Sequence, residues 1–531
     1  MAPKIGWRGP KTTSRIHGED RDVLEDQAPQ LERVNWMRDP GLRRLYAWAF
    51  VLWIASWTTG YDGSMLNNMR IIPKWEDYFD SPTGGLLGIL TALYQIGSLA
   101  SLPIIPFFAD HFGRKFSIAV GCVIMIIGGV IQGAAQNLGM FMGGRFLVGF
   151  GNSLAQLCSP LLLTELCHPQ HRGRVTAVYN CLWNLGYIIN TWLTFGTQHI
   201  NGHASWRIPA FVQCAPAVVQ VIFIFWCPES PRWLIAKDRD DKALHILAKY
   251  HANGNAEHPT VQFEYREIKE TLAMEFQSKK TSSYLDFLRT SGNRYRLMLI
   301  CSVGLFSQWS GNTLVSYFST EIYDSIGLTD PTSKLGINGG LAIMSLFVSV
   351  LCAILVDRVG RRPLFLSATG GMCFAFTIWT ICAAQYEQKR DTAAGKAVIA
   401  FIWIHSFSYA LAWSGLLIAY SVEVLPFKIR AKGLMIMNLS VQVALTVNQQ
   451  LNPIALDNLP HSYDLFIIYN VWVFLELCFV YFFYVETKGP TLEELAKIID
   501  GDEAEVAHVN VKDTAEPVYH EKAPETKTSA L

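Results

Sequence analysis

A single carboxylate stands out near the start of the chain because it lies in an apolar and aromatic stretch. Asp62 comes late in the segment 45–67, which is long enough to cross a lipid bilayer. An ionised carboxylate inside a bilayer costs on the order of 2.5–3.5 kcal/mol even on permissive scales. Proton carriage is one reason to keep it there, with Arg145 in a later apolar segment as its partner. The alternative is that Asp62 caps the end of its helix near the membrane surface, because Asn67 and Asn68 follow closely.

Polar and aromatic side chains share one face of the apolar segment 175–198. They follow a helical spacing of i, i+3, i+4, i+7 and i+11: Asn180, Trp183, Asn184, Tyr187 and Thr191. Amides donate and accept hydrogen bonds with hydroxyl groups, and an indole ring packs on the apolar face of a pyranose. The stripe therefore predicts a sugar-binding surface. The alternative is that these amides join neighbouring helices within the bilayer.

Other candidate sugar-binding residues lie in the second half of the chain. Gln308 and Asn312 are four residues apart in one apolar segment, which places them on one face of a helix, and Tyr317 follows. Trp413 and Asn448 lie in two later apolar segments. Both are candidates to line the same site, and packing between helices is the alternative for each.

Membrane-spanning helices must position these residues, because apolar segments of roughly 20 residues recur along the chain. Six precede a polar stretch and six follow it. They are 45–67, 85–108, 116–136, 141–165, 175–198, 206–227, 296–322, 336–356, 363–384, 397–424, 433–456 and 463–485. The sequence therefore predicts an all-α membrane protein with 12 transmembrane helices in two six-helix halves.

Two short charged loops, half a chain apart, indicate that the halves are copies of one bundle. Residues 110–115 read DHFGRK and residues 357–362 read DRVGRR. Each loop has an acid, a glycine and two bases between apolar segments. Gly113 and Gly360 allow the chain to turn where a side chain would clash. Two copies at equivalent places indicate a duplicated membrane bundle.

The composition narrows the class of protein further. The chain of 531 residues is 50% hydrophobic and only 17% charged, below the roughly 25% charge of soluble proteins. Its 44 bases balance 44 acids, which argues against nucleic acid as a partner. The eleven cysteines include no C-x-x-C pair, so we expect neither structural zinc nor a disulfide framework.

Charge and hydropathy divide the chain into five regions. They are a disordered cytosolic N-terminal tail (1–44), an N-terminal six-helix half (45–227), a cytosolic linker with short helices (228–295), a C-terminal six-helix half (296–485) and a cytosolic C-terminal tail (486–531). Lysine and arginine are concentrated in the loops on the side of the tails and the linker. Because basic loops stay in the cytosol, this side is predicted to be cytosolic.

Ordered motifs over residues 45–495 carry a family resemblance. They include GYDG at 60–63, GRFLVGFG at 144–151, PESPRW at 228–233 and ETKG at 486–489, together with the two charged loops. The chain resembles the sugar porter family of the major facilitator superfamily. The amino-acid sequence of segments 306–312 and 422–433 resembles that of the fungal branch of lactose, cellodextrin and hexose permeases. The resemblance implies the major facilitator fold, in which two halves rock around a central site.

The resemblance also implies roles for individual residues. In proton-coupled members, the residues that match Asp62 and Arg145 pair and separate as the aspartate is protonated. Asn180 stands where the family usually has a sugar-binding glutamine, and Gln308 matches the family directly. Charged residues at the cytosolic ends latch the halves together in the outward-facing state: Asp110, Arg114, Glu165, Arg174, Glu229 and Arg232 in the first half, and Asp357, Arg361, Glu423, Arg430 and Glu486 in the second. The alternative role for these charges is orientation in the membrane alone.

The leading hypothesis is proton-coupled symport of a sugar across the plasma membrane by alternating access. The sugar is a disaccharide such as lactose or cellobiose, or a hexose. An uncoupled sugar facilitator and a transporter-like nutrient sensor are the alternatives. An enzyme is disfavoured, because no phosphate loop, metal cluster or triad spacing stands out. We expect a monomer in the lipid bilayer with a sugar and a proton as its ligands, no nucleic acid partner, no metal, and no cofactor besides the proton as coupling ion.

Overall fold

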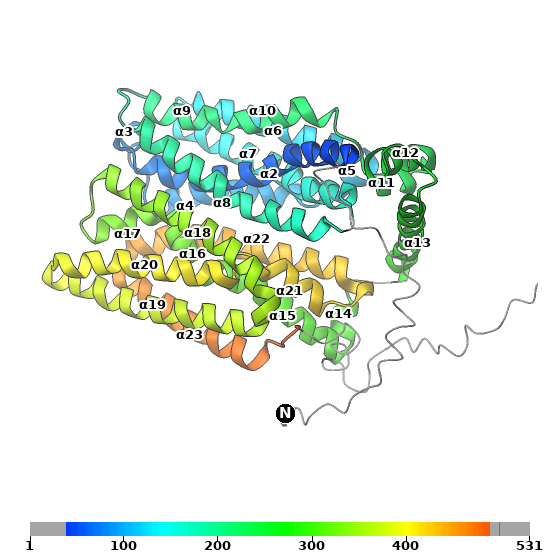
Figure 1. Cartoon of the computed structure of the whole chain (residues 1–531). Helices are drawn as coiled ribbons and strands as arrows, with labels where there is room; N and C mark the ends of the chain where they lie inside the picture. Colours follow the sequence, from blue (N-terminus) through cyan, green and yellow to red (C-terminus); the bar gives the residue numbers. More distant parts are fainter. Residues whose placement is uncertain (1–38, 169, 282, 489–498, 500–531) are drawn as a thin grey trace, which may run out of the picture.

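The computed structural model describes residues 39–168, 170–281, 283–488 and 499. The regular elements of these residues are all helices, arranged as an N-half and a C-half that lie side by side (Figure 1). In Figure 1 the N-half runs from blue through cyan to blue-green and the C-half from green to orange. Most of the two predicted tails, 1–44 and 486–531, lies outside the described residues.

Six membrane crossings form the N-half, each made of one helix or of consecutive helices that continue one another. In chain order they are α2 (Pro40–Arg70), α4 (Gly84–Ser101) continued by α5 (Ile105–His111), α6 (Arg114–Gly133), α7 (Leu138–Leu166), α8 (Arg172–Thr197), and α9 (Ala204–Val212) continued by α10 (Cys214–Ile224). A short helix, α3 (Pro73–Tyr78), follows α2. This half packs around a core of apolar side chains from α2, α6, α7 and α10.

Six crossings also form the C-half. They are α15 (Ser291–Trp309) continued by α16 (Asn312–Tyr317) and α17 (Ser319–Ser325), α18 (Pro331–Val359), α19 (Arg361–Lys389), α20 (Thr392–Ala412) continued by α21 (Leu416–Val424), α22 (Phe427–Asn458) and α23 (Ser462–Phe483). The two halves meet where α4 packs on α22 and where α8 packs on α18.

Four helices connect the halves at one end of the bundle, on the right of Figure 1. They are α11 (Pro231–Ala236), α12 (Asp240–His251), α13 (Pro259–Thr281) and α14 (Asp286–Arg289). We call this end of the bundle the linker end. The opposite end, where α3 and α17 lie, is the far end.

Hydropathy separates the crossings into two groups. In the described part of the chain, eight helices are long and apolar enough to cross a membrane by length and composition. The crossings outside this group are α2, α8, α15 with its continuations, and α22. These are the helices that carry Asp62, the stripe from Asn180 to Thr191, Gln308 and Asn448. Their mean hydropathy is lower because they carry these polar groups into the middle of the bundle.

Two helices begin inside regions that the sequence predicts to be a tail and a linker. Helix α2 starts at Pro40, inside the segment predicted as tail, because the Asp39 side chain accepts hydrogen bonds from the first N–H groups of the helix. Helix α15 starts at Ser291, inside the predicted linker, and Thr290 caps it by accepting from the N–H of Asn293. The predicted short helices of the linker are present, and α13 is longer, at 23 residues.

The crossing that begins with α15 is broken in the middle. Gly311 has φ of +90°, which a residue with a side chain adopts only under strain, and the helix stops before it and restarts at Asn312. The expectation that Gln308 and Asn312 share one helical face is therefore wrong, because the break changes the helical phase between them. Broken membrane helices are tolerated where they are buried in protein or line a cavity.

Glycines allow close contact between helices of the N-half. A Cβ atom at Gly60 (α2) would overlap the backbone of Trp183 on α8, and one at Gly186 (α8) would overlap the carbonyl of Trp57 on α2. The α2–α8 pair therefore approaches backbone to backbone, as small residues permit in membranes.

We expect Gly186→Val to destabilise the N-half, because its side chain must push α2 away from α8. Forcing a larger side chain into a closely packed contact lowers the free energy of unfolding by about 1–3 kcal/mol or more. The measurement is the apparent melting temperature of the purified protein, with size-exclusion chromatography as a check on folding. The matched control is Gly196→Val on the same helix, where a Cβ atom meets nothing within 4 Å. Equal melting temperatures for the two variants would contradict the close contact.

Candidate functional site

The carboxylate of Asp62 lies deep in the N-half beside Arg145. The two residues are 1% and 2% exposed. Nη1 of Arg145 on α7 donates to the backbone oxygen of Asp62 at 3.4 Å, and the guanidinium lies 5.3 Å from the centre of the Tyr94 ring on α4. Within the described residues, neither carboxylate oxygen of Asp62 accepts a hydrogen bond. The Arg145 guanidinium therefore contacts the backbone oxygen of Asp62 and makes no hydrogen bond to its carboxylate.

The position of Asp62 in its helix excludes the interpretation that this residue caps the helix end. Helix α2 continues for two turns beyond Asp62 and ends at Arg70, so Asp62 does not cap the helix end. Asn67 and Asn68, which suggested a surface position, donate hydrogen bonds to Ser319 and Thr191 on other helices. Asp62 is thus an intramembrane carboxylate, the kind of residue that marks a functional site by default.

Gly63, next to Asp62, lies where residues of both halves converge. A methyl group at this glycine would lie 3.8 Å from Oη of Tyr317 on α16 and 3.9 Å from Cζ2 of Trp183 on α8. Trp183 in turn contacts Tyr187, with ring centres 6.0 Å apart. The structure therefore brings three of the predicted sugar-binding residues to the helix turn that carries Asp62. Aromatic rings beside an open backbone suit the apolar face of a sugar ring.

The other residues of the α8 stripe make contacts between helices. Nδ2 of Asn184 donates to Oγ of Ser349 on α18 at 3.3 Å, which joins the N-half to the C-half. Thr191 accepts from Asn68 on α2 at 2.8 Å. Asn180 is exposed and lies one helical turn before Asn184 on α8. In this conformation Asn184 and Thr191 join helices, which is the alternative that the sequence leaves open.

The C-half candidates are placed in two separate environments. Asn448 on α22 donates to the backbone oxygen of Gln308 at 2.8 Å and accepts from Asn452 and Tyr469, both at 2.6 Å. Its side-chain oxygen and one N–H of its amide are therefore engaged within the half. Trp413 is fully buried in the C-half core, where its indole donates to Thr369 at 3.1 Å, so the structure does not bring it to the residues around Gly63.

Polar residues missed by the sequence analysis join the halves at the far end. Arg70 of α2 forms an ion pair with Glu321 of α17, at 2.5 Å between Nη1 and Oε1. Asn67 donates to Ser319 at 2.9 Å, and Asn338 of α18 donates to Asn68 at 3.3 Å. The signal in the sequence is the run of amides and arginine that ends the first apolar segment. Its partners lie about 250 residues away, so the pairing is not readable from the sequence alone.

At the linker end, the predicted charges form one cluster in the N-half. Glu229 accepts from the backbone N–H groups of Arg114 and Lys115, both at 3.3 Å, at the start of α6. Arg114 reaches Glu165 on α7, with 3.2 Å between Nε and Oε2, and lies 3.7 Å from Asp110. The glycine before α6, Gly113, has φ of +98°. A Cβ atom there would lie 2.6 Å from the Glu229 carboxylate.

The same cluster recurs in the C-half. Glu486 accepts from the backbone N–H groups of Arg361 and Arg362 at 3.0 and 3.1 Å, at the start of α19. Arg361 donates to Glu423 at 2.8 Å, and Gly360 has φ of +105°. Each described cluster of charges is therefore built within one half.

Two of the remaining predicted gating residues also lie at the linker end. Arg430 donates to the backbone oxygen of Leu425 at 3.2 Å, and Arg232 lies on α11. The side chains of Arg174 and Asp357 lie outside the described part of the structure.

A second buried carboxylate in the membrane region also escaped the sequence analysis. Glu476 on α23 is 1% exposed and accepts from Nε1 of Trp472 at 2.5 Å. Its other oxygen has no hydrogen-bond partner among the described residues. An acid within the apolar segment 463–485 is the signal that identifies it.

Comparisons with known proteins agree with this architecture. Residues 48–499 match the profile of the sugar (and other) transporter family. A high-affinity glucose transporter of Kluyveromyces lactis is 27% identical over 490 residues, which cover 88% of this chain and 87% of the relative. A quinate permease of Neurospora africana is 28% identical over 513 residues, covering 90% and 91%. The inward open structure of the xylose transporter XylE from E. coli has a TM-score of 0.71 at 20% identity and covers 86% of this chain and 100% of that structure.

The fold and the buried polar site define a membrane transporter of the major facilitator type. The predicted fold, an all-α bundle of 12 transmembrane helices in two six-helix halves, is confirmed by the likeness to XylE. The chain belongs to the sugar porter family of the major facilitator superfamily, as the resemblance of its motifs implies.

We expect Glu321→Gln to loosen the contact between the halves at the far end. The substitution removes the carboxylate charge that pairs with the nearly buried Arg70 guanidinium, and a buried charge left without its counter-charge destabilises the structure around it. The measurement is amide hydrogen exchange over residues 312–325, which we expect to rise. Lys74→Ala is the control, because among the described residues Lys74 donates within the N-half, to the carbonyl of Ile200. Unchanged exchange in Glu321→Gln would show that the ion pair does not hold the halves together.

Proposed function

We propose that the protein transports a sugar together with a proton, and that Asp62 carries the proton. The observation that supports this most directly is the buried Asp62 carboxylate. It has no hydrogen-bond partner among the described residues, and it lies one residue from the point where Trp183 and Tyr317 converge. An ionised carboxylate buried without a partner is strongly disfavoured relative to its neutral form. This conformation therefore favours a protonated Asp62 beside the sugar site.

The arrangement of contacts between the halves supports a definite state of the cycle. Arg70, Asn67 and Asn68 hold the halves together at the far end, whereas at the linker end the hydrogen bonds described above for Glu229 and Glu486 each stay within one half. This pattern is that of a transporter open toward its linker end. We place the linker end in the cytosol of a cell with the protein in its plasma membrane, because basic residues are concentrated there.

In this proposal the proton is released when Arg145 moves from the backbone oxygen of Asp62 to its carboxylate. A guanidinium beside the carboxylate stabilises the ionised form, and withdrawal of the guanidinium restores the neutral form. The two positions of Arg145 lie within one side-chain movement of each other, since Nη1 already contacts Asp62. No cofactor or metal is needed for this exchange, and the proton is the coupling ion.

A hexose is the substrate best supported by the relatives, since the Kluyveromyces lactis relative is named a high-affinity glucose transporter. The disaccharides lactose and cellobiose, predicted from the motifs, are the second candidates. The aromatic pair Trp183 and Tyr317 provides the packing surface for one sugar ring in either case.

The test is uptake of labelled glucose, lactose and cellobiose by transporter-deficient yeast at pH 5 and pH 8, with and without a protonophore. One charge moving inward with the sugar releases about 2.3 kcal/mol per 100 mV, which supports roughly 50-fold accumulation. We expect accumulation in the wild type and only equilibration in Asp62→Asn, because the amide cannot carry a proton.

Glu476→Gln is the matched control, because it removes the other described intramembrane carboxylate of equal burial. It should retain accumulation. Loss of accumulation in Glu476→Gln and not in Asp62→Asn would assign the proton to the C-half. Uptake that is indifferent to pH, protonophore and Asp62 would establish an uncoupled facilitator, and no uptake of any sugar by displayed protein would favour a sensor.

A further inference from the structure

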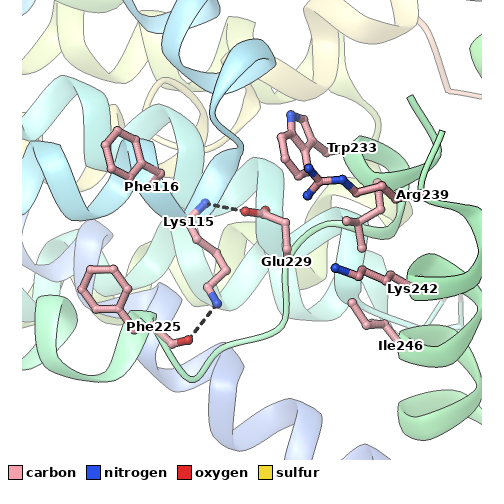
Figure 2. Close-up of a pocket in the computed structure, with 9 residues that line it drawn as sticks. Lys115, Phe116, Phe225, Glu229, Trp233, Arg239, Lys242 and Ile246 are labelled. Carbon is pink, nitrogen blue, oxygen red and sulfur yellow. Dashed lines mark hydrogen bonds between the residues drawn. The ribbon is translucent and has the colours of Figure 1, made fainter. Parts of the chain in front are cut away.

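A pocket of about 350 Å³ lies on the N-half at the linker end, away from the Asp62 site (Figure 2). Its walls come from the start of α6, the segment after α10, and the helices α11 and α12. It thus lies where a membrane crossing meets the helices of the linker. Its lining shares Glu229 with the charge cluster described above, but the side chains of Lys115, Arg239 and Lys242 have no role in that cluster.

Among the charged residues that line the pocket, bases outnumber acids. Lys115, Arg239 and Lys242 face it, against one carboxylate, Glu229. Both oxygens of Glu229 already accept backbone N–H groups at the start of α6 and α11, including that of Ser230 at 2.9 Å. Lys115 donates to the carbonyl of Phe225 at 2.8 Å, which leaves its other two protons available (Figure 2).

The acidic residues beside these bases in the chain, Asp238, Asp240 and Asp241, do not line the pocket. Asp240 at the start of α12 pairs with Lys269 on α13 at 2.9 Å. The Arg239 guanidinium lies over the ring of Trp233, which also lines the pocket, 5.8 Å from its centre.

The remaining wall is aromatic and continues onto the outside of the membrane helices. Phe116 at the start of α6 is 44% exposed and Phe225 just after α10 is 62% exposed. Further along α10, Ile222 and Phe223 are also exposed, as expected of a surface that faces lipid chains. A ligand in this pocket therefore meets cations on the linker side and an apolar surface on the membrane side.

We propose that this pocket binds an anionic glycerophospholipid of the cytosolic leaflet. Its phosphate contacts Arg239, Lys242 and Lys115, and one acyl chain packs along Phe116 and Phe225. Basic pockets at the cytosolic side of membrane helices suit such headgroups. The aromatic wall favours a lipid over a soluble phosphate, because a soluble anion has nothing to place against it. The inference rests on the proposed cytosolic position of the linker end and not on the identity of the sugar.

The C-half offers an internal comparison for this site. Arg362 donates to the carbonyl of Tyr481 at 2.7 Å, as Lys115 does to that of Phe225. The N-half differs because the chain after Glu229 forms α11 and α12, which bring Arg239 and Lys242 to the pocket. The lipid would thus join α6 to the linker helices in the N-half.

The experiment measures lipid binding to the purified full-length protein by native mass spectrometry, with phosphatidylserine, phosphatidylcholine and inorganic phosphate as the three probes. We expect phosphatidylserine to bind at least tenfold more tightly than phosphatidylcholine, and phosphate alone to give no retained adduct. Arg239→Gln with Lys242→Gln should weaken phosphatidylserine binding roughly tenfold or more, since each base near an anionic lipid contributes favourably. Size-exclusion chromatography confirms that the variant is folded.

The matched control is Lys237→Gln with Lys249→Gln, which removes two exposed bases from the same segment outside the pocket. Equal losses in both double variants would show general attraction to the basic surface and overturn the pocket site. Equal affinity for phosphatidylserine and phosphatidylcholine, or retention of phosphate alone, would also overturn the proposal. Sugar uptake takes no part in these measurements, so their outcome is independent of the transport proposal.

Discussion

One interaction, made twice, fixes the linker end of each half: a carboxylate that accepts the first backbone N–H groups of a membrane helix. Glu229 binds the start of α6 and Glu486 the start of α19. The helix dipole and the unpaired N–H groups make this position favourable for an anion. A glycine with positive φ is required before each helix, because a side chain there would meet the carboxylate. Arg114 and Arg361, which follow these glycines, are thereby aimed at Glu165 and Glu423.

Because these clusters are internal, each half can move as one body. The contacts between the halves are of a different kind: an apolar core that contains side chains of both halves, single amide and hydroxyl hydrogen bonds, and the Arg70–Glu321 ion pair. The polar contacts contribute modestly and can be exchanged for water or for other partners. Asp62 and Arg145 belong to one half, whereas Tyr317 reaches the same place from the other. The proton site is therefore carried by one body and its aromatic neighbour by the second.

The sequence predicts the features that depend on local pattern and composition. Helix number, the repeated loops with Gly113 and Gly360, and the α8 stripe all follow from periodicity and residue type. The pairing of Arg70 with Glu321 and the use of Asn448 to hold Gln308 depend on the packing of distant helices, which no local pattern encodes. Trp413 is a further residue whose role the sequence does not determine, because an indole ring can pack on a sugar or in an apolar core. Its hydrogen bond to Thr369 in the structure identifies it as a core residue. The break at Gly311 changed the phase of a helix that periodicity treats as continuous.

The two capping carboxylates also bear on the order in which the protein is made. Glu229 lies 115 residues after the helix start that it caps, and Glu486 lies 125 residues after Arg361. During synthesis the N-half therefore completes its own cluster before any crossing of the C-half emerges. The C-half remains without its cap until the last crossing is inserted. A nascent chain interrupted before residue 486 would hold a finished first bundle and an unfinished second one, a natural point for quality control to recognise.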